Sequence, residues 1–270
     1  MPQVHSTSIV GPRVDLADDV VIGPWCVLEG RIRVGPGTRL VHRVSLQGPL
    51  QLGAGNVFYP GAAVGFAPQD RKFDPDHEGA GIVIGDRNIF REGFTAHRAT
   101  GDTPTTLGSA GYYMANSHVA HDCAVGDEVM FANGAVIGGH VHLGDGVILG
   151  GNSGIHQFCR IGRMTMIAGT TGSTRDVPPF CVVYHTTCRV GSLNLVGLRR
   201  AGLRDHVRPL TRAFNLYFRR GLSSDRALDQ IDQAVGDDPL VAEFSAFIRQ
   251  ARRGILPYAP QPAAGGRAAD

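Results

Sequence analysis

The chain has 270 residues, with 37 glycines, 16 prolines and few aromatic side chains (7%). Its formal net charge of +2 excludes a general electrostatic attraction to nucleic acid, and no apolar run approaches the ~20 residues of a membrane span. Five cysteines at irregular spacing predict free thiols in a reducing compartment. Because the N-terminus has no signal-peptide pattern, we expect a cytoplasmic protein.

An apolar residue recurs every six positions in two unbroken runs. A six-residue period gives one inward side chain per short strand, and three such strands close an 18-residue triangular coil. Glycine, proline, aspartate and asparagine between the apolar positions supply the corners. The pattern therefore predicts a mainly β chain built as a solenoid of stacked parallel coils. The apolar positions are Val10, Leu16, Ile22, Leu28, Val34, Leu40, Leu46, Leu52, Phe58 and Val64, then Leu107, Tyr113, Val119, Val125, Phe131, Ile137, Leu143, Leu149, Ile155, Ile161 and Ile167.

The period is interrupted between the two runs. Ile84 follows Val64 by 20 residues, two more than one coil, so residues 65–83 are predicted to leave the solenoid as an excursion loop. A second slip, of one residue, lies between Ala96 and Leu107. Loops that leave a rigid scaffold often carry function, so both breaks are candidate parts of a site.

The solenoid is predicted to end near residue 190. The Asp-Val-Pro-Pro segment at 176–179 indicates its exit, so we assign residues 1–190 to the solenoid. The apolar residues of 191–257 follow helical spacing, and Asp238 followed by proline is a helix-start signal. This part predicts a small α-helical domain. The Pro-, Ala- and Gly-rich end, residues 258–270, predicts a disordered tail.

Arginines cluster at the start of the helical part. Between Arg189 and Arg220 there are eight arginines and one acidic residue, Asp205. One interpretation is a solvated helix face. The other is a docking surface for an acidic partner, since guanidinium groups bind phosphates and carboxylates in bidentate pairs. The cluster contains no recognised basic motif with interleaved aromatic residues, so nucleic acid is the weaker candidate partner.

Four of the eleven histidines gather in the second run, at His118, His121, His140 and His156. His121 and His140 are one coil plus one residue apart, and coils stack at about 4.8 Å, so the two should lie close together at one corner. Three interpretations stay open: imidazoles that fill corners, a zinc site, and a general base oriented by Asp122. Because successive side chains on a straight strand point to opposite faces, a contact between His121 and Asp122 requires a bend near Cys123.

Five short motifs occur in order along the chain. They are Gln-Asp-Arg-Lys at 69–72, Ser-His-Val-Ala-His-Asp-Cys at 117–123, Gly-Gly-His at 138–140, Gly-Ile-His-Gln-Phe at 154–158 and Asn-Leu-Val-Gly-Leu-Arg-Arg at 194–200. In this order they resemble the acyl carrier protein-dependent UDP-N-acetylglucosamine O-acyltransferases that begin lipid A biosynthesis. The resemblance implies a left-handed parallel β-helix, a homotrimer and active sites between subunits. It also implies transfer of a 3-hydroxyacyl chain from acyl carrier protein to the 3-hydroxyl of UDP-N-acetylglucosamine, without metal or organic cofactor.

The resemblance assigns roles to individual residues. His121 is expected to act as the general base, Asp122 to orient it, and the backbone N–H of Gly139 to stabilise the oxyanion. Met166 and Gly169 are expected to set the acyl-chain length. No residue is expected to bind a metal. The positions expected to contact substrate are Gln69, Asp70, Lys72, His97, His118, His140, His156, Gln157, Asn194 and Arg200.

The chain departs from the family pattern near the expected substrate surfaces. Ala99 stands where the family has a glycine, before a shortened loop, and residues 184–188 replace a family segment after the double proline. Two alternatives of the same fold therefore stay open: transfer to another nucleotide sugar, including a 3-amino sugar that would give an amide, and a trimeric zinc carbonic anhydrase. A purely structural β-helix is the third class, and it would leave the histidine corner unexplained.

Overall fold

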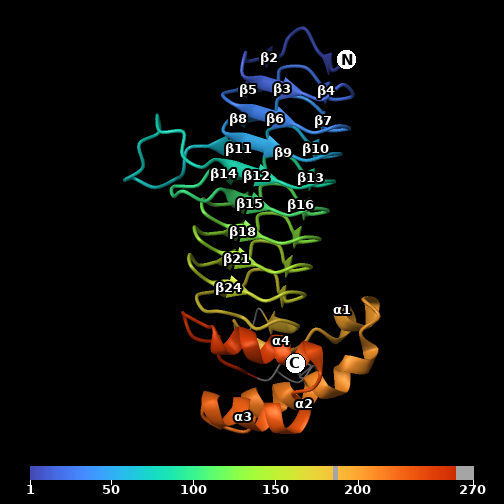
Figure 1. Ribbon diagram of the computed structural model, residues 1–270, viewed down its shortest axis with the longest axis vertical. Coiled ribbons are helices and arrows are strands. Elements are labelled where there is room, and N and C mark those ends of the chain that lie inside the picture. Colours follow the sequence, from blue (N-terminus) through green and yellow to red (C-terminus); the bar gives the residue numbers. More distant parts are fainter. Residues whose placement is uncertain (185–187, 260–270) are drawn as a thin grey trace, which may run out of the picture.

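The computed structural model describes residues 1–184 and 188–259, and it shows a tall solenoid with helices at its C-terminal end (Figure 1). Short parallel strands stack in three sheets as a left-handed β-helix, so the expected fold class is confirmed. Within the described ranges, no helix is long and apolar enough to cross a membrane. The expected disordered tail lies, from residue 260 on, outside the described residues, as do positions 185–187.

Each coil contributes one strand to each of three sheets. Sheet A has 11 strands, in the order β1 (Gln3–Val4), β4 (Val21–Ile22), β7 (Arg39–Leu40), β10 (Val57–Phe58), β13 (Ile89–Phe90), β16 (Tyr112–Tyr113), β19 (Met130–Phe131), β22 (Ile148–Leu149), β25 (Met166–Ile167), β27 (Cys181–Tyr184) and β28 (Arg189–Leu193). Sheet B has 9 strands, in the order β2 (Ile9–Val10), β5 (Val27–Glu29), β8 (Ser45–Gln47), β11 (Ala63–Phe66), β14 (Thr95–His97), β17 (His118–Val119), β20 (Val136–Ile137), β23 (Gly154–Ile155) and β26 (Gly172–Ser173). Sheet C has 8 strands, here in chain order β3 (Val14–Leu16), β6 (Ile32–Val34), β9 (Leu50–Leu52), β12 (Ile82–Ile84), β15 (Thr105–Leu107), β18 (Ala124–Val125), β21 (His142–Leu143) and β24 (Arg160–Ile161).

The residues of the six-residue period form the core of the solenoid. All of them are buried except Val10 and Leu16, which lie in the first coil, where only one neighbouring coil covers them. Residues at equivalent positions of successive coils stack on one another. The ring centroids of Phe58 and Phe90 are 4.5 Å apart, and those of Phe90 and Tyr113 are 4.9 Å apart. Aromatic contacts of this kind add to the stabilisation from burial alone.

Both breaks in the period are loops inserted at one corner, between sheets B and C. Ile84 pairs with Leu52 of the preceding coil, so β11 and β12 are consecutive strands and residues 67–81 between them are wholly inserted (Figure 1, the loop that projects sideways). The second break is also an insertion, residues 98–104, rather than a slip of one residue. The sequence located both breaks but not the size of the insertions, because a loop of any length can restore the phase of the repeat.

The C-terminal part begins with a strand and continues as helices. β28 runs antiparallel to β27 and extends past residue 190, where the sequence placed the change to helix. Its buried Val190 and Leu193 pack on the last coil, which explains the extension. The helices are α1 (Leu195–Arg200), a 3-10 turn (Arg204–His206), α2 (Val207–Phe218), α3 (Ser224–Val235) and α4 (Pro239–Arg249). As expected, Asp238 caps α4 by accepting hydrogen bonds from the first N–H groups of the helix.

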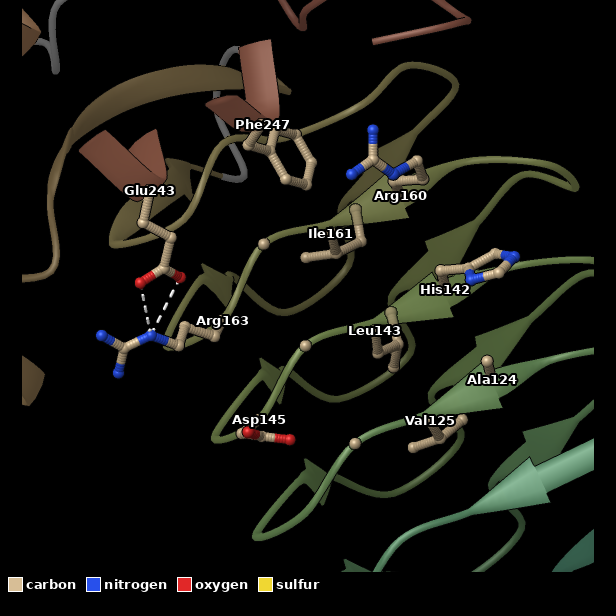
Figure 2. A pocket seen from close by; sticks show the side chains of 13 residues that line it. Ala124, Val125, His142, Leu143, Asp145, Arg160, Ile161, Arg163, Glu243 and Phe247 are labelled. Atoms are coloured by element: carbon tan, nitrogen blue, oxygen red, sulfur yellow. Dashed lines mark hydrogen bonds and ion pairs between the residues drawn. The ribbon is translucent and has the colours of Figure 1, made fainter. Parts of the chain in front are cut away.

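Helix α4 lies against sheet C and closes the end of the solenoid. Arg163 donates from Nε to both carboxylate oxygens of Glu243, at 2.9 and 2.8 Å. The Arg160 guanidinium lies 4.5 Å from the ring centre of Phe247. These four side chains line a cavity between the sheet and the helix (Figure 2). The helical part is therefore attached to the solenoid by specific contacts, not only by the chain connection.

Candidate active site

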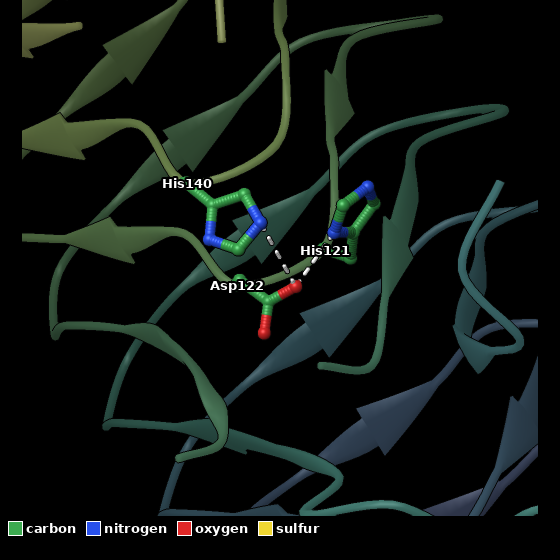
Figure 3. Close-up of side chains that lie close together, drawn as sticks. All are labelled: His121, Asp122 and His140. Carbon is green, nitrogen blue, oxygen red and sulfur yellow. Dashed lines mark hydrogen bonds and ion pairs between the residues drawn. The ribbon is translucent and has the colours of Figure 1, made fainter. Parts of the chain in front are cut away.

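The corner between sheets B and C brings the predicted base and its partner together (Figure 3). His121 Nδ1 lies 2.6 Å from Asp122 Oδ2, and His140 Nε2 lies 3.6 Å from the same oxygen. The rings of His121 and His140 are perpendicular, with centroids 5.4 Å apart. The proximity of the two histidines expected from the coil register is confirmed.

The backbone at Asp122 explains how two adjacent side chains can meet. Asp122 and His140 occupy equivalent positions in successive coils, and each has a φ of +59°. This left-handed conformation turns the chain at the corner. The bend expected near Cys123 lies one residue earlier, at Asp122, and Cys123 is buried in the core. Burial raises the pKa of the Cys123 thiol to about 12, so it is not a nucleophile at neutral pH.

The inserted loop 98–104 holds the Asp122 carboxylate. The Thr100 hydroxyl donates to Oδ2 at 2.6 Å, and the N–H groups of Thr100 and Gly101 donate at 3.1 Å. Burial, the largest influence, raises the pKa of Asp122, but these hydrogen bonds and the one from His121 together leave the pKa below its usual value. The ionised carboxylate accepts a hydrogen bond from His121 Nδ1–H, and this tautomer leaves a lone pair on Nε2.

Gly139 occupies the position equivalent to His121 in the next coil. A Cβ built there would lie 2.7 Å from His121 Cε1 and 2.9 Å from Nε2. Gly139 is buried, and among residues 1–184 and 188–259 nothing accepts a hydrogen bond from its N–H. Buried N–H groups are normally paired, so this donor beside the imidazole is available to a bound molecule.

The same three side chains also have the spacing of a metal site. The ligand atoms of His121, Asp122 and His140 all lie within 4.8 Å of one another. The oxygen that faces both rings already accepts hydrogen bonds from Thr100 and His121. This use of the carboxylate suits the orientation of an imidazole for proton transfer.

His118 and His97 lie one and two coils before His140, respectively, at the same edge. Their ring centroids are 5.2 Å apart. His118 Nδ1 is 2.8 Å from the Thr95 hydroxyl, and His97 Nδ1 is 2.7 Å from the carbonyl oxygen of Ala67. Burial lowers the pKa of His118 to about 4 and also lowers that of His97. Both are therefore neutral at pH 7 and suited to hydrogen bonding rather than to charge pairing.

The expected substrate contacts on the excursion loop lie in the inserted segment 67–81. The Lys72 N–H donates to Asp70 Oδ1 at 2.9 Å, which shapes a tight turn. Gln69 and Lys72 are exposed. In the described part of the chain, no hydrogen bond or ion pair joins these side chains to His121.

His156 and Gln157 lie at the B–C corner one coil beyond His140. Both are exposed, and His156 Nδ1 lies 3.1 Å from the carbonyl oxygen of Gln157. The next residue, Phe158, was missed by sequence reasoning. Its ring stacks on His140 at 4.6 Å and is 50% exposed. Its position, 18 residues after His140, was the available signal.

Asn194 directly precedes α1 and Arg200 ends it, at the far end of the solenoid. The Asn194 side chain accepts from Gly197 N–H and donates to the Met164 carbonyl, both at 2.9 Å. It is 8% exposed, so its observed role is to cap α1. Arg200 is exposed in the last turn. Within the described residues, neither contacts the histidine corner of the same chain.

Met166 and Gly169 lie near the corner between sheets A and B. Met166 is 38% exposed in the outer row of sheet A. A Cβ at Gly169 would meet the Gly151 carbonyl oxygen at 3.2 Å, so this stretch of backbone leaves little room. On the neighbouring sheet B, the outward positions after His118 become small at Gly154 and Gly172.

Known proteins resemble the chain over nearly its whole length. A family model described as UDP N-acetylglucosamine O-acyltransferase, domain 2, matches residues 176–256. The acyl-(acyl-carrier-protein)–UDP-N-acetylglucosamine O-acyltransferase of Thermodesulfovibrio yellowstonii is 37% identical, covering 94% of this chain and 99% of the relative. That of Halorhodospira halophila is also 37% identical, covering 95% and 100%.

Solved structures agree with these relatives. The UDP-N-acetylglucosamine O-acyltransferase of Moraxella catarrhalis has a TM-score of 0.90 and 35% identity, covering 94% of this chain and 99% of that one. The UDP-N-acetylglucosamine acyltransferase of Campylobacter jejuni has a TM-score of 0.88 and 32% identity, covering 95% and 100%. With the fold and the histidine corner, these likenesses identify the chain as a member of the acyl carrier protein-dependent UDP-N-acetylglucosamine O-acyltransferase family.

Proposed function

We propose that this chain transfers a 3-hydroxyacyl group from acyl carrier protein to the 3-hydroxyl of UDP-N-acetylglucosamine, with His121 as general base. The single observation that carries the proposal is the 2.6 Å contact between His121 Nδ1 and Asp122 Oδ2. It fixes the neutral tautomer in which Nε2 accepts a proton. The family relatives support the O-acyltransferase over the alternative nucleotide sugars.

The reaction needs one proton acceptor, one hydrogen-bond donor to the oxyanion and a thiol leaving group. His121 Nε2 takes the proton from the sugar 3-hydroxyl as that oxygen attacks the thioester carbonyl carbon. The Gly139 N–H donates to the oxyanion of the tetrahedral intermediate. The C–S bond then breaks, and the imidazolium returns its proton to the departing thiolate. General-base assistance of this kind contributes roughly 10²–10⁴-fold to the rate.

Substrate binding is assigned to the residues around this corner. The neutral His97 and His118 would hydrogen-bond the sugar, while Gln69, Asp70 and Lys72 reach a substrate held against a neighbouring subunit. Lys72 is the only lysine in the chain, and its compact ammonium suits a single anionic or carbonyl oxygen. The remaining expected contacts are His140, His156, Gln157, Asn194 and Arg200, with Met166 and Gly169 limiting the acyl chain.

The proposed carrier-protein surface is on α2. Arg208 and Arg212 of this helix line one pocket together with neutral side chains and Arg220, which lies two residues beyond the helix. Clustered guanidinium groups attract an acidic partner and speed its approach. This favours the docking interpretation of the arginine cluster.

We propose further that the active enzyme is a cytoplasmic homotrimer. Large apolar side chains stay partly exposed on the solenoid of a single chain, at Met130 (37%), Val136 (40%) and Met166 (38%). Contact with neighbouring copies would cover them. No disulfide joins the cysteines among the described residues, which fits a reducing compartment. Light scattering of the purified protein tests the trimer, and a monomer would refute it.

The decisive experiment measures acylation of radiolabelled UDP-N-acetylglucosamine with a panel of 3-hydroxyacyl carrier proteins, for the native protein and for His121→Ala. Product from the native protein that falls by several orders of magnitude in the variant supports both the reaction and the base. Activity that survives in His121→Ala would refute the assignment of the base. Dialysis against a chelator should leave kcat unchanged, and a loss of activity restored by zinc would instead favour a metal at this corner.

A further inference from the structure

Arg98 is a buried cation between the excursion loop and the solenoid. It is 2% exposed. Its Nη atoms donate to the carbonyl oxygens of Gly65 at 3.2 Å, Pro75 at 2.8 Å and His77 at 3.0 Å. A buried guanidinium is costly unless its N–H groups are paired, so these carbonyls must stay in place. Arg98 therefore fixes the path of the loop.

The residues on either side of Arg98 make further contacts with the same loop. His97 Nδ1 lies 2.7 Å from the Ala67 carbonyl oxygen, at the start of the loop. The Ala99 N–H donates to the Gly81 carbonyl at 3.1 Å, at its end. Residues 97–99 thus contact both ends of the segment that carries Lys72, while Arg98 contacts its middle.

The next two residues, Thr100 and Gly101, contact the catalytic corner. They contact the Asp122 carboxylate instead of the loop. The Thr100 N–H, the Thr100 hydroxyl and the Gly101 N–H donate hydrogen bonds to it at 2.6–3.1 Å. Asp122 in turn contacts His121. Five consecutive residues, 97–101, therefore connect the excursion loop to the carboxylate behind the base without an intervening flexible link.

We propose that residues 97–101 couple the placement of the excursion loop to the orientation of His121, with Arg98 and Thr100 as positioning residues. The inference rests on the proposed function. When the loop is displaced, the backbone at Thr100 moves with it, and the donors that aim Asp122 lose their geometry. Loop placement thus affects the chemical step as well as the binding of the nucleotide sugar.

The test is a double-mutant cycle with Thr100→Val and Arg98→Lys, measuring kcat and KM for UDP-N-acetylglucosamine at saturating acyl carrier protein. Thr100→Val removes one hydrogen bond to an ionised group, so kcat should fall roughly tenfold, with KM little changed. Thr100→Ser should restore it. Arg98→Lys keeps the charge but loses the fork of donors, so KM should rise and kcat should fall together. Because both variants disturb one unit, the double variant should lose less kcat than the product of the single losses.

The matched control is Arg33→Lys, because the Arg33 side chain is 75% exposed and, within the described residues, forms an ion pair only with Asp15. It should leave both constants unchanged. If Arg98→Lys changes KM alone, or if the kcat losses multiply, loop and base are independent and the coupling is refuted. If Arg98→Lys fails to fold, Phe73→Leu, which removes the ring 5.6 Å from the guanidinium, replaces it in the cycle.

A readout that needs no turnover separates this inference from the proposed function. In histidine-labelled protein, the Nδ1–H resonance of His121 should shift in Arg98→Lys, although Arg98 does not contact the ring. A shift in a protein that acylates no sugar would support the coupling while the proposed function fails. An unshifted resonance would overturn the coupling even in an active enzyme.

Discussion

Replacement of Gly139 by alanine tests whether the His121 ring acts from the position seen in the structure. The new Cβ would lie 2.7 Å from Cε1, whereas ordinary contacts are 3.4–4 Å, so the ring has to move by about 1 Å. The Gly139 backbone does not require positive φ, so alanine introduces no backbone strain there. A displacement of this size at a catalytic group costs roughly 10²-fold in rate, or about 2.7 kcal/mol of transition-state stabilisation.

The assay is steady-state acylation of UDP-N-acetylglucosamine, with thermal unfolding as the folding control. Gly139→Ala should lower kcat/KM roughly 100-fold while Tm changes by only a few degrees. The same substitution made in His121→Ala meets no ring and should have no further effect. An equal loss in both backgrounds would refute the steric argument and place the effect in the Gly139 peptide itself.

Three further predictions concern the carboxylate, a buried histidine and the basic helix. Asp122→Asn should lower kcat roughly 10²–10⁴-fold in steady-state kinetics with KM little changed, since an amide does not enforce the Nδ1–H tautomer. The pKa of His118 is lowered from 6.5 to about 4, so the unfolded chain binds the proton first as pH falls. Urea titrations should therefore show about 2 kcal/mol less stability at pH 5 than at pH 7 from this residue, a contribution that His118→Gln should lack. Arg208→Glu combined with Arg212→Glu should raise KM for the acyl carrier protein severalfold but not KM for the sugar; equal changes in both would contradict docking on α2.

The solenoid could be predicted because its period is set by local geometry. Each strand has one inward residue and each corner recurs every six residues, so the apolar period from Ile22 to Ile167 can be read directly from the sequence. β28 does not follow this period, because it pairs antiparallel with β27 instead of with a strand of a further coil. Its last residues, from 191 on, were therefore assigned to the helical part.

The site was predictable only where residues share the coil register. His121 and His140 are one coil plus one residue apart, so their proximity follows from counting. Thr100 and Arg98 belong to an inserted loop with no register, and the path of such a loop depends on tertiary hydrogen bonds that no spacing encodes. The roles of the site residues stay predictions until the variants are measured.

The strand pairing also restricts where this chain can change length. Each coil pairs only with its neighbours, so one extra residue within a strand or at a tight corner would turn every later side chain out of phase. Both inserted loops, 67–81 and 98–104, leave at the corner between sheets B and C, beside the histidines. Insertions and deletions among relatives should therefore collect at this edge, where they alter substrate contacts without disturbing the stack.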